Sequence, residues 1–264
     1  MNKIIFRIII VFLAIAGLFL FLREFNWSKI FGLDDATQKL EQELGNQIWE
    51  SMKSTENVDH DTMMMEVLDT IVNRLCASNQ IQRSKIKLHL MENATANAFA
   101  MPGDYLIVHS GLFTNGCKTA DQIAGVIAHE LAHIEKNHVS RKITTQIGIT
   151  ALTTLVGGNA EAVKEAIRFF TSNAYDRSLE EEADLMAVTY MNESNLDPKA
   201  LAETMDIFSE KSANPELEEN LSWFSTHPAS KERADYIRKE SNKIKGKNYQ
   251  KLQISQEYKE HFGW

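Results

Sequence analysis

The sequence predicts a mostly helical α+β fold, and three observations lead to this prediction. Gly and Pro are few, 12 and 4 among 264 residues, whereas sandwiches built on many tight turns need more of both. Apolar residues recur at three- and four-residue spacings through most of the chain, as they do on the buried face of a helix. Between residues 86 and 90 they instead alternate with polar residues, which is typical of a strand.

Composition and charge narrow the classes of protein that remain. The hydrophobic content of 44% suffices for one folded domain, which we place at residues 34–264. Lys and Arg total 28 against 36 Asp and Glu, a net charge of -8, so we expect no basic surface able to neutralise several phosphates and no nucleic-acid partner. Cys76 and Cys117 are too far apart for a CxxC pair; they are either two buried thiols or one disulfide formed in an oxidising compartment.

Residues 1–33 are expected to form a membrane anchor and a linker. Ile4–Leu22 is apolar except for Arg7. As a helix it just spans a hydrocarbon core of about 30 Å if Arg7 reaches the headgroups. A cleaved signal peptide is the alternative, but the end of the apolar segment, Phe19–Phe25, lacks the small-x-small site that cleavage needs. Lys3 and Arg7 predict that the N-terminus is cytoplasmic and that the segment crosses the membrane once. The domain that follows is then expected on the extracytoplasmic side, which in a bacterium is the periplasmic side of the inner membrane.

The remaining elements follow from local patterns. In chain order these are helices over 36–53 and 62–78, a strand over 86–90, and hairpin strands over 97–101 and 105–108 around Pro102-Gly103-Asp104. Helical spacing returns after Gly111, with ends expected near 157–158, 195–198 and 214–215. The apolar stretch 143–156 is too short to span a membrane, so we expect a buried or membrane-surface helix there rather than a re-entrant segment.

A helix over 119–138 carries the most informative motif. Thr119 and Gln122 form a capping-box pattern at its start. His129 and His133 are one turn apart, so both imidazoles can bind one metal ion at about 2.0–2.1 Å. Glu130 lies about 100° around the helix and can reach the same site without being a ligand. The alternative is that both histidines are satisfied by neighbouring carbonyls, so a third ligand is needed to decide.

His138 is not expected to be that ligand. In the metzincin pattern, a Gly follows the second histidine by three residues and a third histidine follows that Gly by three more. Here these two positions are Lys136 and Val139. On a continuous helix His138 also lies about 140° from His133. We therefore interpret His138 as a polar or structural residue.

A second helix, marked by an apolar stripe from Leu179 to Tyr190, offers the better candidate. Glu180 and Asp184 share one of its faces. Glu180 could complete a His-His-Glu zinc site, while Asp184 accepts a proton from the free nitrogen of a zinc-bound imidazole. The alternative for three consecutive glutamates is a charged solvent face, which we expect for Glu181 or Glu182.

The motifs between Asn97 and Arg233 resemble those of the membrane-associated zinc metalloendopeptidases that include HtpX, BepA and the CAAX prenyl proteases. Four segments carry the resemblance: Asn97–Gly103 with the following hairpin strand, Ala128–His133, Tyr175–Asp184, and Thr226-His227-Pro228 with Glu232-Arg233. The resemblance implies a zincin-like peptidase domain with a small hairpin or sheet beside the HExxH helix. It also implies one Zn²⁺ per chain, with Glu180 as its third ligand. A single predicted span favours BepA-like or mitochondrial quality-control members over prenyl proteases.

The expected function is that of a membrane-anchored zinc endopeptidase. Glu130 is expected to take a proton from the water that attacks a peptide carbonyl. An edge strand around 98–100 could bind any extended chain, which suits unfolded or damaged proteins; a role in protein quality control rests on the resemblance alone. The alternative is a membrane-tethered, chaperone-like binding module with a structural zinc site, against which the presence of Glu130 argues.

His227 has three possible interpretations. It could be a surface histidine in a loop pinned by Pro228. Alternatively, Trp223, Phe224 and Pro228 hold the loop over the cleft, where His227 either donates to the developing oxyanion or occupies the open position of the zinc ion in a resting state.

Overall fold

A computed structural model of the chain describes residues 33–148, 153–154, 156–157, 160–212, 223–228, 231–244 and 246–264. The chain divides into two compact units, Met1–Leu40 and Glu41–Trp264, and the second holds the site considered below. The anchor predicted for Ile4–Leu22 lies outside the described residues. Among the helices that are described, none is both long and apolar enough to traverse a bilayer.

The first two helices begin and end close to where the pattern predicts. Helix α3 spans Leu33–Thr55 and α4 spans Thr62–Asn79. The Asp61 side chain accepts the backbone N–H of Met64 at 2.9 Å, which fixes the start of α4. Gln80, with φ 58°, ends it in the left-handed region. The buried face of α4 is the predicted one: Met64, Val67, Leu68, Ile71, Val72, Leu75 and Cys76.

Three short strands form one sheet in the order β1-β3-β2. The strands are β1 (Lys87–Met91), β2 (Ala98–Met101) and β3 (Tyr105–His109). β2 and β3 pair antiparallel across a turn in which Gly103 and Asp104 both have positive φ, which confirms the predicted hairpin. β1 pairs with β3 in parallel, so β2 is left at the sheet edge.

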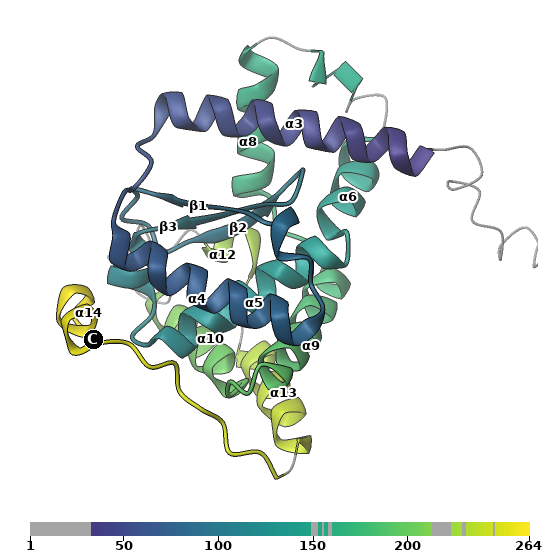
Figure 1. The fold of residues 1–264 in the computed structure, drawn as a ribbon. Helices are drawn as coiled ribbons and strands as arrows, with labels where there is room; N and C mark the ends of the chain where they lie inside the picture. Colours follow the sequence, from purple (N-terminus) through teal and green to yellow (C-terminus); the bar gives the residue numbers. More distant parts are fainter. Residues whose placement is uncertain are drawn as a thin grey trace, which may run out of the picture. The chain divides into compact units, whose positions relative to one another are not determined.

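Helices lie on both sides of this sheet (Figure 1). On one side, the Glu41–Thr55 part of α3 stacks the ring of Trp49 on His89, with centroids 3.8 Å apart. On the other side, α5 (Ala120–Glu135) contacts β2. The π-helical turn Leu112–Gly116 and the short 3-10 turn Arg83–Lys85 connect these parts.

The other described helices follow α5 in the chain. They are α6 (His138–Lys142), α8 (Ala160–Ser172), α9 (Arg177–Glu193), α10 (Lys199–Ser212), α12 (Trp223–Thr226), α13 (Lys231–Lys243) and α14 (Gln256–Phe262). α9 and α10 pack on α5, and α13 packs on both of them. Gly125 permits the close approach of α10, because a Cβ there would lie 2.9 Å from the Leu201 Cα. The predicted end near 195–198 is confirmed, since Asn195 has φ 56° and α10 begins after Pro198.

Two predicted helices differ from the structure. The helix predicted over 119–138 ends at Glu135, because Asn137 adopts φ 54° and the chain restarts as α6 at His138. The prediction of one helix over 143–156 is also wrong. A π-helical turn spans Ile143–Ile147, and Gly148 ends it at φ 82°, a conformation that no α-helix contains. Residues 149–152 and 155 lie outside the described residues. The helix end predicted near 214–215 also lies outside them.

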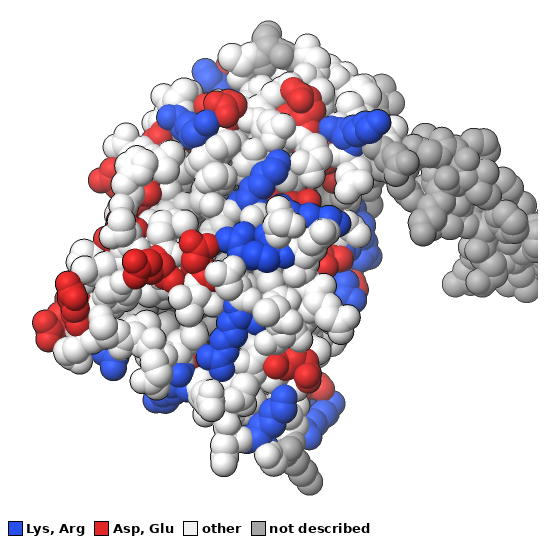
Figure 2. Space-filling view, viewed as in Figure 1, with Lys and Arg blue, Asp and Glu red and all other residues white. Residues whose placement is uncertain are grey.

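The two cysteines are free and buried, which decides for the thiols over the disulfide. Burial raises the pKa of Cys76 to about 11 and that of Cys117 to about 12, so both stay protonated at neutral pH. On the described part of the face in Figure 2, acidic and basic side chains are interspersed. The expectation of no nucleic-acid partner stays a prediction.

Candidate metal centre

Helix α5 carries His129, Glu130 and His133 through the centre of the domain. All three side chains are fully buried. The start of the helix is fixed as predicted, since the Thr119 side chain accepts the backbone N–H of Gln122 at 3.2 Å. The HExxH residues therefore sit on a well-anchored helix in the core.

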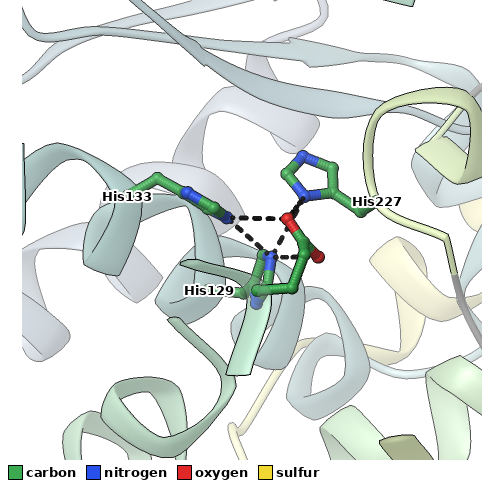
Figure 3. A group of neighbouring side chains, drawn as sticks. His129, His133 and His227 are labelled. Carbon is green, nitrogen blue, oxygen red and sulfur yellow. Dashed lines mark hydrogen bonds and ion pairs between the residues drawn. The ribbon is translucent and has the colours of Figure 1, made fainter. Parts of the chain in front are cut away.

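Four donor atoms from three parts of the chain converge beside α5. His129 Nε2 lies 3.0 Å from His133 Nε2 and 3.2 Å from His227 Nδ1. Glu180 Oε1 lies 3.4 Å from His133 Nε2 and 2.9 Å from His227 Nδ1. All four atoms lie within 4.8 Å of one another. Figure 3 shows the three imidazoles pointing toward this common point.

The spacing of these atoms fits a zinc ion. Ligands at about 2.0–2.1 Å from one ion in a tetrahedron lie about 3.3 Å from one another. The four separations above are 2.9 to 3.4 Å. Imidazole nitrogens and a carboxylate oxygen are also donors that zinc accepts.

The outer nitrogens of two histidines give a second reason to expect a cation. His129 Nδ1 lies 2.9 Å from Asp184 Oδ1, and His133 Nδ1 lies 3.0 Å from His138 Nδ1. If each Nδ1 donates its proton outward, both Nε2 atoms carry lone pairs that face each other at 3.0 Å. Such lone pairs repel unless a positive charge lies between them.

The carboxylates around His129 favour a positive charge at this site. Burial by itself lowers the pKa of His129, but the Asp184, Glu180 and Glu130 carboxylates outweigh burial and raise it. Burial lowers the pKa of His133 well below its usual range, which keeps this imidazole neutral, as a metal ligand must be.

Asp184 and Arg233 form a buried ion pair that contacts His129 and Glu180 of the cluster. Arg233 donates to Asp184 through Nε and Nη2, both at 2.8 Å, and its Nη1 lies 2.7 Å from Glu180 Oε2. Burial raises the pKa of Asp184, but the Arg233 charge and the bond to His129 lower it to about 2. Tyr236 also donates its hydroxyl hydrogen to Asp184. Asp184 thus remains ionised behind His129, where the sequence predicted it.

His138 lies behind His133, although it comes five residues later. The break at Asn137 redirects the chain, so the imidazole of His138 faces His133 instead of pointing away from it. Its Nε2 lies 3.3 Å from Glu182 Oε2. His138 therefore supports the cluster and is not one of the four converging side chains. Glu181, the sequence neighbour of Glu182, is exposed.

Glu130 stands beside the cluster with its carboxylate held by two donors. The backbone N–H of Ala100 on β2 donates to Oε2 at 3.1 Å, and the indole N–H of Trp223 donates to Oε1 at 3.0 Å. His227 Nε2 lies 3.3 Å from the same Oε1. Sequence reasoning missed the contact between Trp223 and Glu130, because no local pattern links residues so far apart.

His227 is fully buried against the cluster, so its interpretation as a surface histidine is wrong. It follows the short helix α12, and its backbone N–H bonds to Trp223 O at 2.9 Å. Trp223 is likewise fully buried, and its ring stacks on His227 with centroids 5.0 Å apart. The segment Trp223–Pro228 therefore covers the donors on one side.

The sequence is similar to a known protein family and to several known proteins. The profile of Peptidase family M48 matches residues 64–241. The mitochondrial metalloendopeptidase OMA1 of Schizosaccharomyces pombe is 29% identical over 170 residues, 62% of this chain and 49% of that protein. The beta-barrel assembly-enhancing protease of Yersinia pestis is 24% identical over 231 residues, 80% of this chain and 46% of that protein. The metalloprotease LoiP of Escherichia coli is 28% identical over 179 residues, which are 65% of this chain and 68% of that protein. The chain spans about half the length of the first two.

Proposed function

The chain belongs to peptidase family M48, and on this premise we propose that it is a zinc-dependent metalloendopeptidase that hydrolyses peptide bonds of unfolded or damaged proteins. The family resemblance read from the motifs is confirmed. The observation that carries the proposal is the convergence of His129, His133, Glu180 and His227 donor atoms beside the buried carboxylate of Glu130.

In this proposal His129, His133 and Glu180 hold one zinc ion. Zinc, when bound, acidifies a water molecule to a pKa of roughly 7 and polarises the scissile carbonyl. Asp184 fixes the tautomer of His129 by accepting its Nδ1 proton across 2.9 Å, and Arg233 keeps that carboxylate in place.

Glu130 acts as the general base and then as the general acid. Its carboxylate takes a proton from the attacking water and returns it to the leaving amine. The donors at 3.1 Å from Ala100 and 3.0 Å from Trp223 orient the two oxygens, so that one of them can face the water while the other stays bonded.

The substrate would bind as an extended chain along β2. This strand pairs with β3 on one side only, and its Ala100 N–H faces Glu130. Backbone hydrogen bonds to an edge strand read no side chains, which suits unfolded proteins. The backbone N–H of Trp223 donates to Ala96 O at 3.4 Å, so the segment Trp223–Pro228 lies close to the start of this strand.

We assign His227 to the resting state. Its Nδ1 lies 3.2 Å from His129 Nε2 and 2.9 Å from Glu180 Oε1, so His227 could hold a zinc ion together with the other three residues. Departure of His227 would open this position to water and substrate. This role is favoured over that of an oxyanion donor, which would leave the fourth position open.

The membrane anchor and the location remain part of the proposal. The apolar segment Ile4–Leu22 would anchor residues 34–264 by a single pass, with the peptidase domain on the extracytoplasmic side. Relatives named for beta-barrel assembly and for mitochondria support a role in protein quality control at a membrane.

One observation favours a second candidate, a membrane-tethered chaperone-like binding module with structural zinc. Four protein side chains converge on the site, as in structural zinc sites, which are closed. Incubation of the purified protein with casein, with a chelator, and with zinc restored after chelation separates the two. Cleavage that the chelator stops and zinc restores supports the peptidase, whereas intact casein beside a zinc-loaded protein supports the binding module.

A further inference from the structure

Tyr175 joins the two sides of the candidate site. It precedes α9, which carries Glu180, and its backbone N–H donates to Thr226 O at 3.2 Å in the segment that carries His227. Its ring lies against the His133 ring with centroids 4.1 Å apart and planes at 29°, and 5.4 Å from the His227 ring with planes at 24°.

The hydroxyl of Tyr175 is buried without a hydrogen-bond partner among the described residues. The side chain is only 7% exposed. Other tyrosine hydroxyls do find partners: Tyr105 donates to Asn46 at 2.9 Å, and Tyr236 donates to Asp184. A buried hydroxyl without a partner costs free energy, so its presence beside a metal cluster calls for a ligand that it binds only during function.

Ring contacts place Tyr175 beside two of the converging imidazoles, those of His133 and His227. No described carbonyl or carboxylate accepts the hydrogen of its hydroxyl. The O–H group is therefore available to donate to a bound substrate. The Lys142 ammonium, itself buried, lies 4.3 Å from the ring centroid and helps to hold the ring in place.

We propose that Tyr175 is a further catalytic residue, whose hydroxyl donates a hydrogen bond to the oxygen of the scissile carbonyl as it becomes an oxyanion. This inference rests on the proposed peptidase function. When the water oxygen bonds to the carbonyl carbon, the π electrons move to the carbonyl oxygen and Glu130 takes the proton. When the C–N bond breaks, that electron pair returns and Glu130 protonates the amine. Tyr175 keeps its proton throughout, and its bond is strongest at the tetrahedral stage.

The test uses Tyr175→Phe, which removes the hydroxyl and keeps the ring stacked on His133. Tyr190→Phe is the matched control, because Tyr190 is also 7% exposed and lies further along α9. Three quantities are measured on the zinc-loaded full chain: zinc content, kcat and KM for an unfolded substrate, and affinity for two peptide inhibitors, a tetrahedral phosphonate and a planar hydroxamate.

The inference predicts that Tyr175→Phe retains its zinc and its KM while kcat falls by about 10². Phosphonate affinity should fall by at least about tenfold while hydroxamate affinity is little changed, and Tyr190→Phe should match the wild type throughout. Unchanged kcat and unchanged phosphonate affinity would overturn the inference. Loss of zinc in Tyr175→Phe alone would also overturn it in favour of a structural role.

Failure of the proposed function looks different from failure of this inference. A wild-type chain that holds zinc but leaves peptides intact contradicts the peptidase proposal. In that case the phosphonate comparison still decides whether the Tyr175 hydroxyl binds a tetrahedral oxyanion.

Discussion

The Nδ1 atoms of His133 and His138 lie 3.0 Å apart, so a second imidazole contacts the outer nitrogen of this cluster histidine. Across the site, a buried carboxylate does the same for His129 at 2.9 Å. His138 in turn contacts Glu182, which ends the series at a carboxylate near the surface. The outer nitrogen of His129 thus contacts a carboxylate, whereas that of His133 contacts an imidazole.

This relationship predicts the effect of His138→Ala on zinc binding. Loss of the bond to His133 should weaken zinc affinity by about 10- to 100-fold, as for other residues that orient a ligand. Glu180→Ala removes one of the proposed ligands and should cost more. Competition with a chromogenic chelator measures both. Full wild-type affinity in His138→Ala, or equal losses in Glu180→Ala and the exposed Glu181→Ala, would contradict these assignments.

Arg233→Ala should destabilise the fold. The buried Asp184 carboxylate would lose its bidentate partner, and breaking a buried ion pair from one side costs about 3–5 kcal/mol in the free energy of unfolding. Arg238→Ala is the control, because the pair of Arg238 with Asp206 is about one third exposed on both side chains. Such a pair contributes about 0–1 kcal/mol. Urea denaturation at fixed zinc compares them, and equal losses would refute the buried pair as a major contribution.

His109 predicts a pH dependence that is independent of the metal ligands. Burial lowers its pKa from 6.5 to about 4, with a backbone contact at Thr95 opposing the shift. The unfolded chain therefore takes up a proton below pH 6.5 that the folded protein refuses until about pH 4. Stability should fall over this interval as pH falls, by about 3 kcal/mol in total.

His109→Leu should remove this contribution, so its unfolding free energy should depend less on pH between 6.5 and 4 than that of the wild type. His60→Leu, at an exposed position, is the control and should keep the wild-type slope. Parallel curves for wild type and His109→Leu would show that the histidine titrates normally in the folded state.

His227→Ala tests whether the segment Trp223–Pro228 restrains the proposed peptidase activity. Removal of an imidazole 3.2 Å from His129 Nε2 should open the fourth ligand position, which raises casein cleavage and self-cleavage. Initial rates and mass spectrometry of the stored protein measure the two. A fall in kcat of about 10² to 10³ with unchanged KM would instead identify His227 as an oxyanion donor.

Local periodicity was enough to predict much of the site. Residues His129, Glu130 and His133 lie on the predicted helix, and Glu180 and Asp184 face them from a second predicted helix. Their placement could be predicted because residues one turn apart share one face of a helix, whereas their roles as ligands, base and support remain predictions. The β2–β3 hairpin succeeds for the same reason, since Gly103 at φ 77° marks its turn.

The rest depended on contacts that local patterns do not contain. The parallel pairing of β1 with β3 joins strands that are not consecutive. The left-handed Asn137 ends α5 one turn early and brings His138 behind His133, which a continuous helix would forbid. Arg233 reaches Asp184 across 49 positions of sequence, and only the packing of α13 on α9 brings them together.

The most direct test of the proposed function is the cleavage of casein by zinc-loaded Glu130→Gln beside the wild type. Glutamine keeps the size of the side chain, and its one amide oxygen can accept one of the two hydrogen bonds from Ala100 and Trp223, but it cannot take a proton from water. The variant should bind as much zinc as the wild type while its cleavage rate falls by at least about 10². Equal cleavage by the two proteins at equal zinc content would contradict a peptidase mechanism that works through Glu130.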